Sequence, residues 1–532
     1  MIALPFAAVI VTLVLSYLGS RIGRRDKRLP PGPPTVPFLG NLLQLPTKRA
    51  HLKFFEWAQQ YGGIYSLKVG PATTIVITSP RLVRQLVDKK SSQYAHRPAS
   101  HIGNGIIGGG DHVLLMEYSE QWRTCRKLIH QYFMEQVVMK QHLALIDAEA
   151  VQMLRDLIVE PSGHMRHPKR FSNSIIMSLV YGTRTPKTDT KHMKKLYALM
   201  EEWSKVMEPG NTPPIDVFPF LKWVPESLLG QWRTRAQHVS NEMNGLYNDW
   251  HEYVNRRRLQ SGSRDCFLDR LLDNEEKNGL NKHAMYFLCG TLMEGGSDTT
   301  SSIIIAFVHA MTKWPKVMRK AQEQIDRVVD EDRSPRWEDY NELPYVVGCV
   351  KEAMRWRPVA PLGFPHTLAE DDEVDGMLLP KGSDIIINAY GMQHDEGRFP
   401  DADRFDPDHY KGYTALASEL ANGDYEKRDH YGYGAGRRLC PGIHLAERNL
   451  FIAISKLLWA FDILPGVDAV GNVIEPDVRN ETAYSAGFLV CAEPYPCRIT
   501  PRSEARRATI MREFEKAEID VFSRYEIPEE QH

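Results

Sequence analysis

Apolar residues recur at helical spacing over long stretches of this chain, and this pattern predicts a mainly helical protein. It holds from about residue 119 to 360, with breaks at 161–163, 209–219 and 261–264, where proline, glycine or serine gather. Residues 443–461 repeat the same spacing. Helices are therefore expected well beyond their average share in globular proteins.

Strand-like segments are few and short. Residues 64–69 and 73–78, joined by Gly70-Pro71, are typical of a β-hairpin. Short strands are also expected at 377–379 and 384–388, and we find no internal repeat. The expected fold is one large domain, mainly α with a small β region.

The N-terminus has the pattern of a membrane anchor. Residues 2–18 carry no charged side chain, and a basic cluster follows within residues 21–28. About 17 apolar residues is the short end of a membrane span, and the basic cluster is expected to stay cytoplasmic. A cleaved secretory signal is the alternative, but in such a signal the positive charges precede the apolar stretch, whereas here they follow it. We expect a single-pass anchor at 1–20, a basic and proline-rich linker at 21–34, the domain at 35–502, and a charged tail, forming a peripheral helix, at 503–532.

Charge and cysteine content narrow the possible partners. The net charge is −1, from 66 basic and 67 acidic residues, so charge gives no reason to expect nucleic acid as a partner. The seven cysteines are scattered, odd in number and lack the spacing of a metal site. This pattern predicts reduced thiols on the cytosolic side of a membrane.

Cys440 stands in an unusual setting. The run Tyr433-Gly-Ala-Gly-Arg-Arg-Leu-Cys-Pro-Gly442 wraps glycines and Arg438 around it, just ahead of the predicted helix at 443–461. The positive end of that helix and free backbone N–H groups are expected to lower the cysteine pKa and to hold a thiolate. A buried inert cysteine is the alternative, but it explains neither the glycines nor the arginine.

A second unusual segment lies within the apolar stretch 287–314. Its centre reads Glu294-Gly-Gly-Ser-Asp-Thr-Thr300. Each glycine costs a helix about 1 kcal/mol relative to alanine, and an acid in so apolar a stretch adds a desolvation cost. Such violations are expected at functional sites. The alternative is a helix break, with Asp298 or Thr299 capping a second helix.

Together these segments resemble the cytochrome P450 family. The Cys440 loop resembles its haem-binding signature, with Tyr433 where the family usually has Phe, and 294–300 resembles its oxygen-binding helix. The resemblance covers essentially the whole chain. It implies haem b as cofactor, Cys440 as the iron ligand, and Asp298 and Thr299 as the acid–alcohol pair that relays protons.

The resemblance extends to a structural motif. Glu352 and Arg355, spaced to pair on a helix from Tyr345 to Trp356, match the family's Glu-x-x-Arg motif. A further arginine joins this pair in the family, and His409 stands at the matching position here. The network is then expected to depend partly on protonation of His409.

Residues that contact the haem propionates are also implied by the resemblance. Trp122 and Arg126 share a helix face and match the family's Trp-x-x-x-Arg motif. Arg97, His366 and Arg438 occupy places where relatives contact the propionates.

Residues 103–108 satisfy the glycine spacing of a dinucleotide-binding loop, but no strand precedes them. We expect a flexible loop over the active site instead. Electrons from NADPH would then arrive through a separate NADPH–cytochrome P450 reductase. Arg123, Lys127 and Arg437 are the expected docking face.

The resemblance implies a haem-thiolate monooxygenase of the endoplasmic reticulum membrane, with its catalytic domain facing the cytosol. A P450-fold isomerase or dehydratase acting without O₂, and a non-catalytic haem sensor, are the alternatives. The expected pocket walls are mainly apolar, so the substrate is expected to be apolar or aromatic. The chain is similar to fungal enzymes of secondary metabolism, and we expect hydroxylation of a small phenol such as m-cresol in a patulin-like pathway. A larger polyketide or terpenoid scaffold, or catabolism of a simple aromatic acid, remain open.

Overall fold

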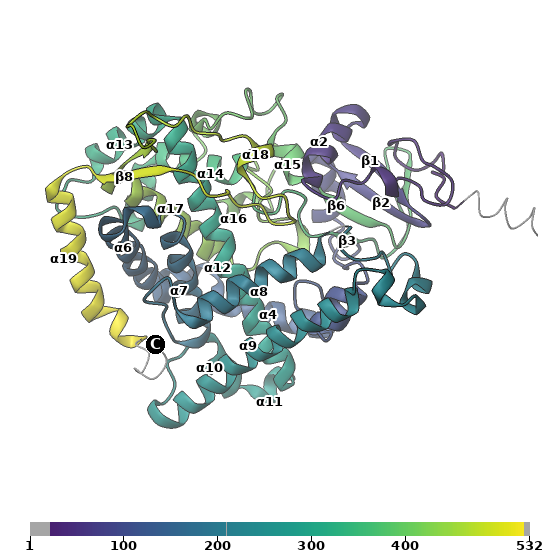
Figure 1. Ribbon diagram of the computed structural model, residues 1–532, viewed down its shortest axis with the longest axis horizontal. Coiled ribbons are helices and arrows are strands. Elements are labelled where there is room, and N and C mark those ends of the chain that lie inside the picture. The colour runs from purple at the N-terminus through teal and green to yellow at the C-terminus, as the bar shows by residue number, and fades with distance from the viewer. Residues whose placement is uncertain (1–21, 209, 526–532) are drawn as a thin grey trace, which may run out of the picture.

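Helices make up most of the molecule, as the sequence predicts (Figure 1). The computed structural model describes residues 22–208 and 210–525. The helices of its first half are α2 (Ala50–Tyr61), α3 (Pro80–Leu82), α4 (Glu120–Phe133), α5 (Glu135–Val137), α6 (Leu143–Val159), α7 (His167–Tyr181), α8 (Lys191–Met207) and α9 (Trp232–Ser261). Those of its second half are α10 (Phe267–Asp273), α11 (Glu275–Asn278), α12 (Lys282–Lys313), α13 (Pro315–Val328), α14 (Pro344–Trp356), α15 (Ala389–Gln393), α16 (Ala417–Leu420), α17 (Ile443–Ala460), α18 (Asn480–Ala483) and α19 (Glu504–Asp520).

A four-stranded sheet lies at one end of the molecule (Figure 1). The strands are β1 (Ile64–Val69), β2 (Ala72–Ile77), β3 (His366–Thr367), β4 (Asp372–Val374), β5 (Met377–Leu379), β6 (Asp384–Ile387), β7 (Phe461–Pro465) and β8 (Cys497–Pro501). One sheet has the order β1-β2-β6-β3, and β4-β5 and β7-β8 form separate pairs. β1 and β2 are antiparallel, which confirms the predicted hairpin, and β2 pairs with β6 in parallel.

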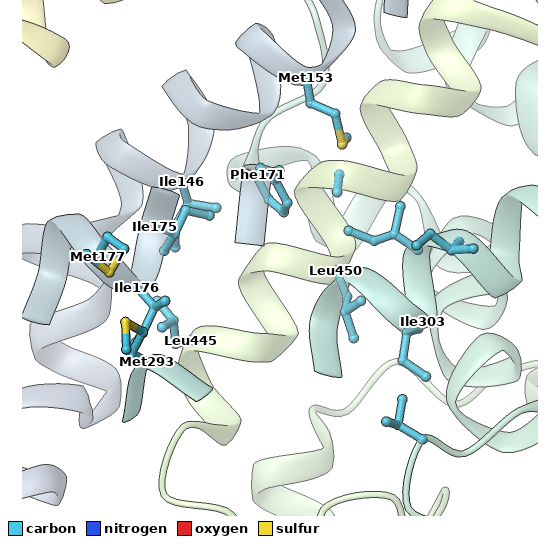
Figure 2. Packing of buried hydrophobic residues seen from close by; sticks show 14 of the residues in the cluster. Ile146, Met153, Phe171, Ile175, Ile176, Met177, Met293, Ile303, Leu445 and Leu450 are labelled. Atoms are coloured by element: carbon cyan, nitrogen blue, oxygen red, sulfur yellow. The ribbon is translucent and has the colours of Figure 1, made fainter. Parts of the chain in front are cut away.

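The long helix α12 runs through the main hydrophobic core. It packs against α7, α9, α14 and α17, and the core also takes in α6. Figure 2 shows side chains of this core, among them Ile176 from α7, Met293 and Ile303 from α12, and Leu445 from α17. α12 is therefore packed against helices from both halves of the chain.

Local capping fixes where two key helices begin. The Ser119 hydroxyl accepts from the backbone N–H of Trp122 at 3.1 Å and caps α4. The Asn281 side chain accepts from the N–H of Ala284 at 2.8 Å and caps α12. The alternative of a helix break, with Asp298 or Thr299 capping a second helix, is excluded, because α12 continues as one helix from Lys282 to Lys313.

The predicted anchor, residues 1–20, lies outside the described residues. Within 22–208 and 210–525, no helix is long and apolar enough to cross a membrane. The proline-rich segment after the basic cluster contacts the β region directly. Arg25 donates to the carbonyls of Gly32 and Pro33 at 2.8 Å, and to the hydroxyl of Ser66 at 2.9 Å. The segment predicted as a linker is therefore bonded to β1.

The charged tail forms α19, the helix expected there, along the outer side of α6 (Figure 1). Arg506 pairs with Asp326 at 2.9 Å, and Glu513 accepts from the Ser334 hydroxyl at 2.5 Å. Ala517 and Phe522 are buried against Ala148 of α6. These contacts make the helix part of the folded domain.

Candidate active site

The loop before Cys440 is held against the segment Val83–Asp88. Gly436 has φ of +61°, and a Cβ there would lie 2.5 Å from the Val87 carbonyl oxygen, so only glycine fits. The Gly436 N–H donates to the Asp88 carboxylate at 2.9 Å. The Cys440 N–H donates to the Tyr433 carbonyl oxygen, also at 2.9 Å. The glycines that mark this loop in the sequence therefore allow a close turn that presents Cys440.

The Cys440 thiol lies just before α17, whose N-cap is Gly442. Burial raises its pKa, and this effect exceeds the opposing influence of the Gly442 N–H and the positive charge of Arg126. The expectation of a lowered pKa is therefore wrong for the protein alone, because desolvation outweighs the helix end. A bound metal cation deprotonates a coordinating thiol outright, so the residue suits a ligand role.

On α12, Gly295 is exposed although the helix around it is enclosed by other helices. A Cβ at Gly295 would meet nothing within 4 Å, whereas one at Gly296 would lie 2.6 Å from the Ile176 side chain of α7. The two adjacent glycines thus have different roles. Gly296 permits close packing against α7, and Gly295 leaves one face of α12 open.

Thr299 and Asp298 lie one turn beyond Gly295. The Thr299 hydroxyl donates to the Gly295 carbonyl at 2.7 Å. Burial raises the pKa of the Asp298 carboxyl, against the lowering effect of the Lys169 ammonium. A raised carboxyl pKa brings an acid closer to the pH at which it can carry protons.

Lys169, on α7, was not predicted from the sequence. Its effect on Asp298 depends on the packing of α7 against α12, and a lone lysine on a helix carries no sequence signal.

Two arginines, Arg97, which is buried, and Arg438, which is half-buried, are held by backbone carbonyls. Arg97 donates to the carbonyls of Phe364 and Pro365 at 2.7 Å and of Leu114 at 2.9 Å. Arg438 donates to the carbonyls of Ala95 and Met116 at 2.7 Å. The Arg438 guanidinium also lies 4.2 Å from the ring centroid of Trp122, which is buried on α4.

These cations lack negative partners. No carboxylate among the described residues forms an ion pair with Arg97, Arg126 or Arg438. Burial lowers the pKa of Arg97 to about 9, and burial with repulsion from Arg97 and Arg126 lowers that of Arg438 to about 8. Buried charge of one sign is costly unless it is paired. The two propionates of a haem would supply the missing negative charge, so the residues fit that cofactor.

His366, the other residue expected to contact a propionate, differs from the arginines because its ring is neutral. Its Nδ1 lies 2.7 Å from the Tyr94 carbonyl oxygen, so that nitrogen is the donor. Burial and repulsion from Arg97 and Arg438 hold the pKa of His366 well below its usual value. The ring is therefore neutral, and its Nε2 becomes a donor to a carboxylate only on protonation.

The structural motif forms as predicted. Arg355 donates from Nε and Nη2 to the two carboxylate oxygens of Glu352, both at 2.7 Å, and both side chains are fully buried. His409 Nδ1 lies 3.2 Å from Glu352 Oε1. Burial lowers the pKa of His409, but its hydrogen bond and charge attraction to Glu352 outweigh this and raise it above the ordinary value.

The glycine-rich run 103–108 does not form the expected flexible loop. It lies mostly in a π-helical turn, His101–Ile107, whose start is capped by the Ser100 hydroxyl. A Cβ at Gly103 would lie 2.7 Å from the Met207 side chain, so its glycine serves packing.

The basic residues expected to receive a reductase are all exposed. Arg123 and Arg437 both lie near one ring, with guanidinium carbons 5.9 and 5.4 Å from the Tyr118 centroid. Arg437 directly precedes Arg438, so this surface adjoins the cysteine loop.

Comparison with known proteins agrees with this geometry. Residues 30–478 match the family model described as Cytochrome P450. The chain is 49% identical to the cytochrome P450 monooxygenase yanC of Aspergillus niger and 48% identical to macC of Penicillium terrestre, each over 98% of both chains. It is 49% identical to the monooxygenase patH of Aspergillus clavatus over 99% of both. The chain belongs to the cytochrome P450 family and is a haem-dependent monooxygenase.

Proposed function

We propose that this enzyme inserts one oxygen atom of O₂ into an apolar or aromatic small molecule, as a hydroxylation step in fungal secondary metabolism. The observation that carries the proposal is the open face of α12 at Gly295, where a side chain would meet no neighbour within 4 Å. The Thr299 hydroxyl is held there by its hydrogen bond to the Gly295 carbonyl oxygen at 2.7 Å. Full-length similarity to fungal monooxygenases supports it.

We assign the site residues two tasks, which are holding haem and transferring protons. Haem, when bound, supplies the activation of O₂. Cys440 is the residue that would hold its iron, and Arg97, Arg126, Arg438 and Trp122 would hold its propionate edge.

Asp298 and Thr299 would transfer protons. Asp298 holds a proton more readily than a solvated carboxyl does, because burial raises its pKa. Thr299 offers a hydroxyl whose orientation the Gly295 carbonyl fixes. Such a pair delivers protons to a site that excludes bulk water.

The wall residues support an apolar or aromatic substrate. Ile107 is buried in the π-helical turn, and the rings of Phe364 and Phe488 pack 4.9 Å apart. These surfaces favour a planar apolar ring, and a small phenol such as m-cresol is the substrate we propose.

The same proposal includes the location and electron supply. Residues 1–20 would anchor the enzyme in the endoplasmic reticulum membrane with the domain in the cytosol, since the basic cluster follows the apolar stretch. NADPH–cytochrome P450 reductase would deliver electrons at the surface around Tyr118.

The test is coupled turnover of the purified holoenzyme with reductase, NADPH and a panel of phenols and polyketides. We expect O₂-dependent hydroxylation in the wild type. Asp298→Asn and Thr299→Ala should lower product formation per NADPH by about 10- to 100-fold, because each removes a proton-transfer group. Ser301→Ala, which removes a hydroxyl bonded to the Ser297 and Asp298 carbonyls, is the matched control. Product formation without O₂ would support an isomerase or dehydratase instead.

A further inference from the structure

A small cavity lies behind the cysteine loop, where helices α14 and α17 meet the segment that leads into the loop. Its volume is about 30 Å³. Its polar lining includes Lys351 of α14, Asp429 before the loop, Tyr433 in the loop and Glu447 of α17, and most of the remaining wall is apolar. Such a volume is enough for about one or two water molecules, provided that polar groups are there to bind them.

Two charged groups at the cavity neutralise each other. The Lys351 ammonium donates to the Asp429 carboxylate at 2.6 Å, and both side chains are buried. Burial lowers the pKa of the neighbouring His430 to about 4, so that ring is neutral. The Glu447 carboxyl and the Tyr433 hydroxyl differ from these groups, because each leaves hydrogen-bonding capacity unused.

One oxygen of the Glu447 carboxyl lacks a partner, although only 8% of the residue is exposed. Oε1 accepts from the Ala417 N–H at 2.5 Å, but Oε2 is buried and has no hydrogen-bond partner among the described residues. Arg448 Nη1 lies 3.6 Å from Oε2, which is too far for a hydrogen bond. Burial raises the pKa of Glu447 to about 7, against the lowering influence of Ser418 and Arg448. Oε2 is therefore the oxygen that can carry a proton near neutral pH.

Tyr433 stands in the loop itself, at the position where the family usually has Phe. Its carbonyl oxygen accepts from the Cys440 N–H at 2.9 Å. Its hydroxyl forms no hydrogen bond among the described residues. Burial, and after it the negative charges that Glu447 and Cys440 carry when ionised, raise the pKa of Tyr433 well above the ordinary value, which places the hydroxyl near both residues. Tyr433 thus binds the backbone of Cys440 and shares a cavity with Glu447.

We propose that a water molecule in this cavity joins the Glu447 carboxyl to the Tyr433 hydroxyl, and that these two side chains are positioning residues for the Cys440 thiolate. The water would satisfy Glu447 Oε2 and the hydroxyl, and it would hold Tyr433 so that its carbonyl oxygen fixes the Cys440 N–H. This link rests on the proposed role of Cys440 as the iron ligand, but it depends on no particular substrate. It gives a role to the hydroxyl by which the loop departs from the family pattern.

The experiment is a double-mutant cycle on the holoenzyme. The measured quantity is the rate at which the thiolate-type Soret band of the ferrous carbon monoxide complex is lost in moderate denaturant. Tyr433→Phe keeps the ring and removes the hydroxyl, so it should speed this loss about fivefold, the effect of one hydrogen bond. In a Glu447→Leu background the same change should have no effect, because the water has lost its other partner. The cycle cancels the loss of the Glu447 bond to Ala417, which both Glu447→Leu proteins share.

Two further variants separate the water link from general packing. Glu447→Gln keeps an oxygen for the Ala417 N–H and turns an NH₂ group toward the cavity, so Tyr433→Phe should again speed the loss about fivefold in this background. Tyr340→Phe is the matched control, because Tyr340 also lines the cavity but its hydroxyl donates to the Thr414 carbonyl oxygen at 2.9 Å. Tyr340→Phe should have the same effect on the rate in the wild type and in the Glu447→Leu background.

Three spectroscopic results would overturn the inference. One is a Tyr433→Phe protein that loses the band at the wild-type rate, the second is an equal effect of Tyr433→Phe with and without Glu447→Leu, and the third is no effect in the Glu447→Gln background.

A crystal structure of the holoenzyme gives an independent check. It should place a water molecule within hydrogen-bond distance of both Glu447 Oε2 and the Tyr433 hydroxyl, and a cavity without that water would also overturn the inference. A wild type without a thiolate-type band would defeat the proposed role of Cys440, whereas a normal band with no coupling between Glu447 and Tyr433 defeats only this inference.

Discussion

The guanidinium of Arg438 lies 4.2 Å from the centroid of the Trp122 ring, joining the cysteine loop to helix α4. Its N–H groups are spread over the Ala95 and Met116 carbonyls, so the cation is oriented without a carboxylate partner. This relationship explains how a half-buried positive charge is held in place while staying available to an anionic group of a cofactor.

Removing that charge should weaken haem binding. Arg438→Ala should lower the affinity for haem about tenfold, because a charge-assisted hydrogen bond to a propionate is lost. The haem-to-protein ratio of purified samples measures this. Arg437→Ala, the exposed neighbour, should retain the wild-type ratio. Equal ratios in the two variants would exclude Arg438 as a propionate ligand.

The adjacent glycines of α12 should respond in opposite directions to alanine. Gly296→Ala places a Cβ 2.6 Å from Ile176 and should destabilise the protein by about 1–3 kcal/mol. Gly295→Ala meets no neighbour within 4 Å and should gain up to about 1 kcal/mol from helix propensity, while narrowing the open face. Denaturant unfolding of both variants tests this. A stable Gly296→Ala protein would show that α7 moves aside.

The Glu352–Arg355–His409 network should make stability depend on pH. The folded-state pKa of His409 is raised above its unfolded value, so its contribution is complete below about pH 6.5 and is lost as pH rises through the folded pKa. His409→Ala should therefore lower Tm most near about pH 6 and least near about pH 9. The loss in unfolding free energy should be roughly 1 kcal/mol or less, because His409 is partly exposed. His409→Arg should remove the pH dependence. If His409→Ala lowered Tm more at high pH than at low pH, the predicted direction of the pH dependence would be wrong.

The surface around Tyr118 should govern electron delivery. Charge reversal at Arg123 or Arg437 should slow reduction by the reductase about tenfold at low salt and weaken its salt dependence. Stopped-flow reduction under carbon monoxide measures the rate. Arg498→Glu, an exposed arginine on β8, provides the control and should change little. Unchanged rates and salt dependence in the Arg123 and Arg437 variants would place docking elsewhere.

Local patterns in the sequence predicted the features that depend on neighbouring residues. The Cys440 loop and the Glu352–Arg355 pair can be predicted because each motif lies within ten consecutive residues or fewer. The raised pKa of Cys440 cannot be predicted in this way, because it results from burial, and burial depends on how distant segments pack around the thiol. The contact between His112 and Glu294 joins positions 182 residues apart, and neither residue alone carries a signal. The turn at His101–Ile107 was missed because glycines lower local helix propensity, while packing against Met207 restores the helical turn.

The most direct test of the account is the carbon monoxide difference spectrum of the ferrous protein, recorded for the wild type, Cys440→Ser and Cys497→Ser. Cys497 is another half-buried free cysteine, on β8. The account predicts the thiolate-type Soret band in the wild type and in Cys497→Ser, and its loss in Cys440→Ser. A thiolate-type band that persists in Cys440→Ser would contradict the assignment of Cys440 as the iron ligand.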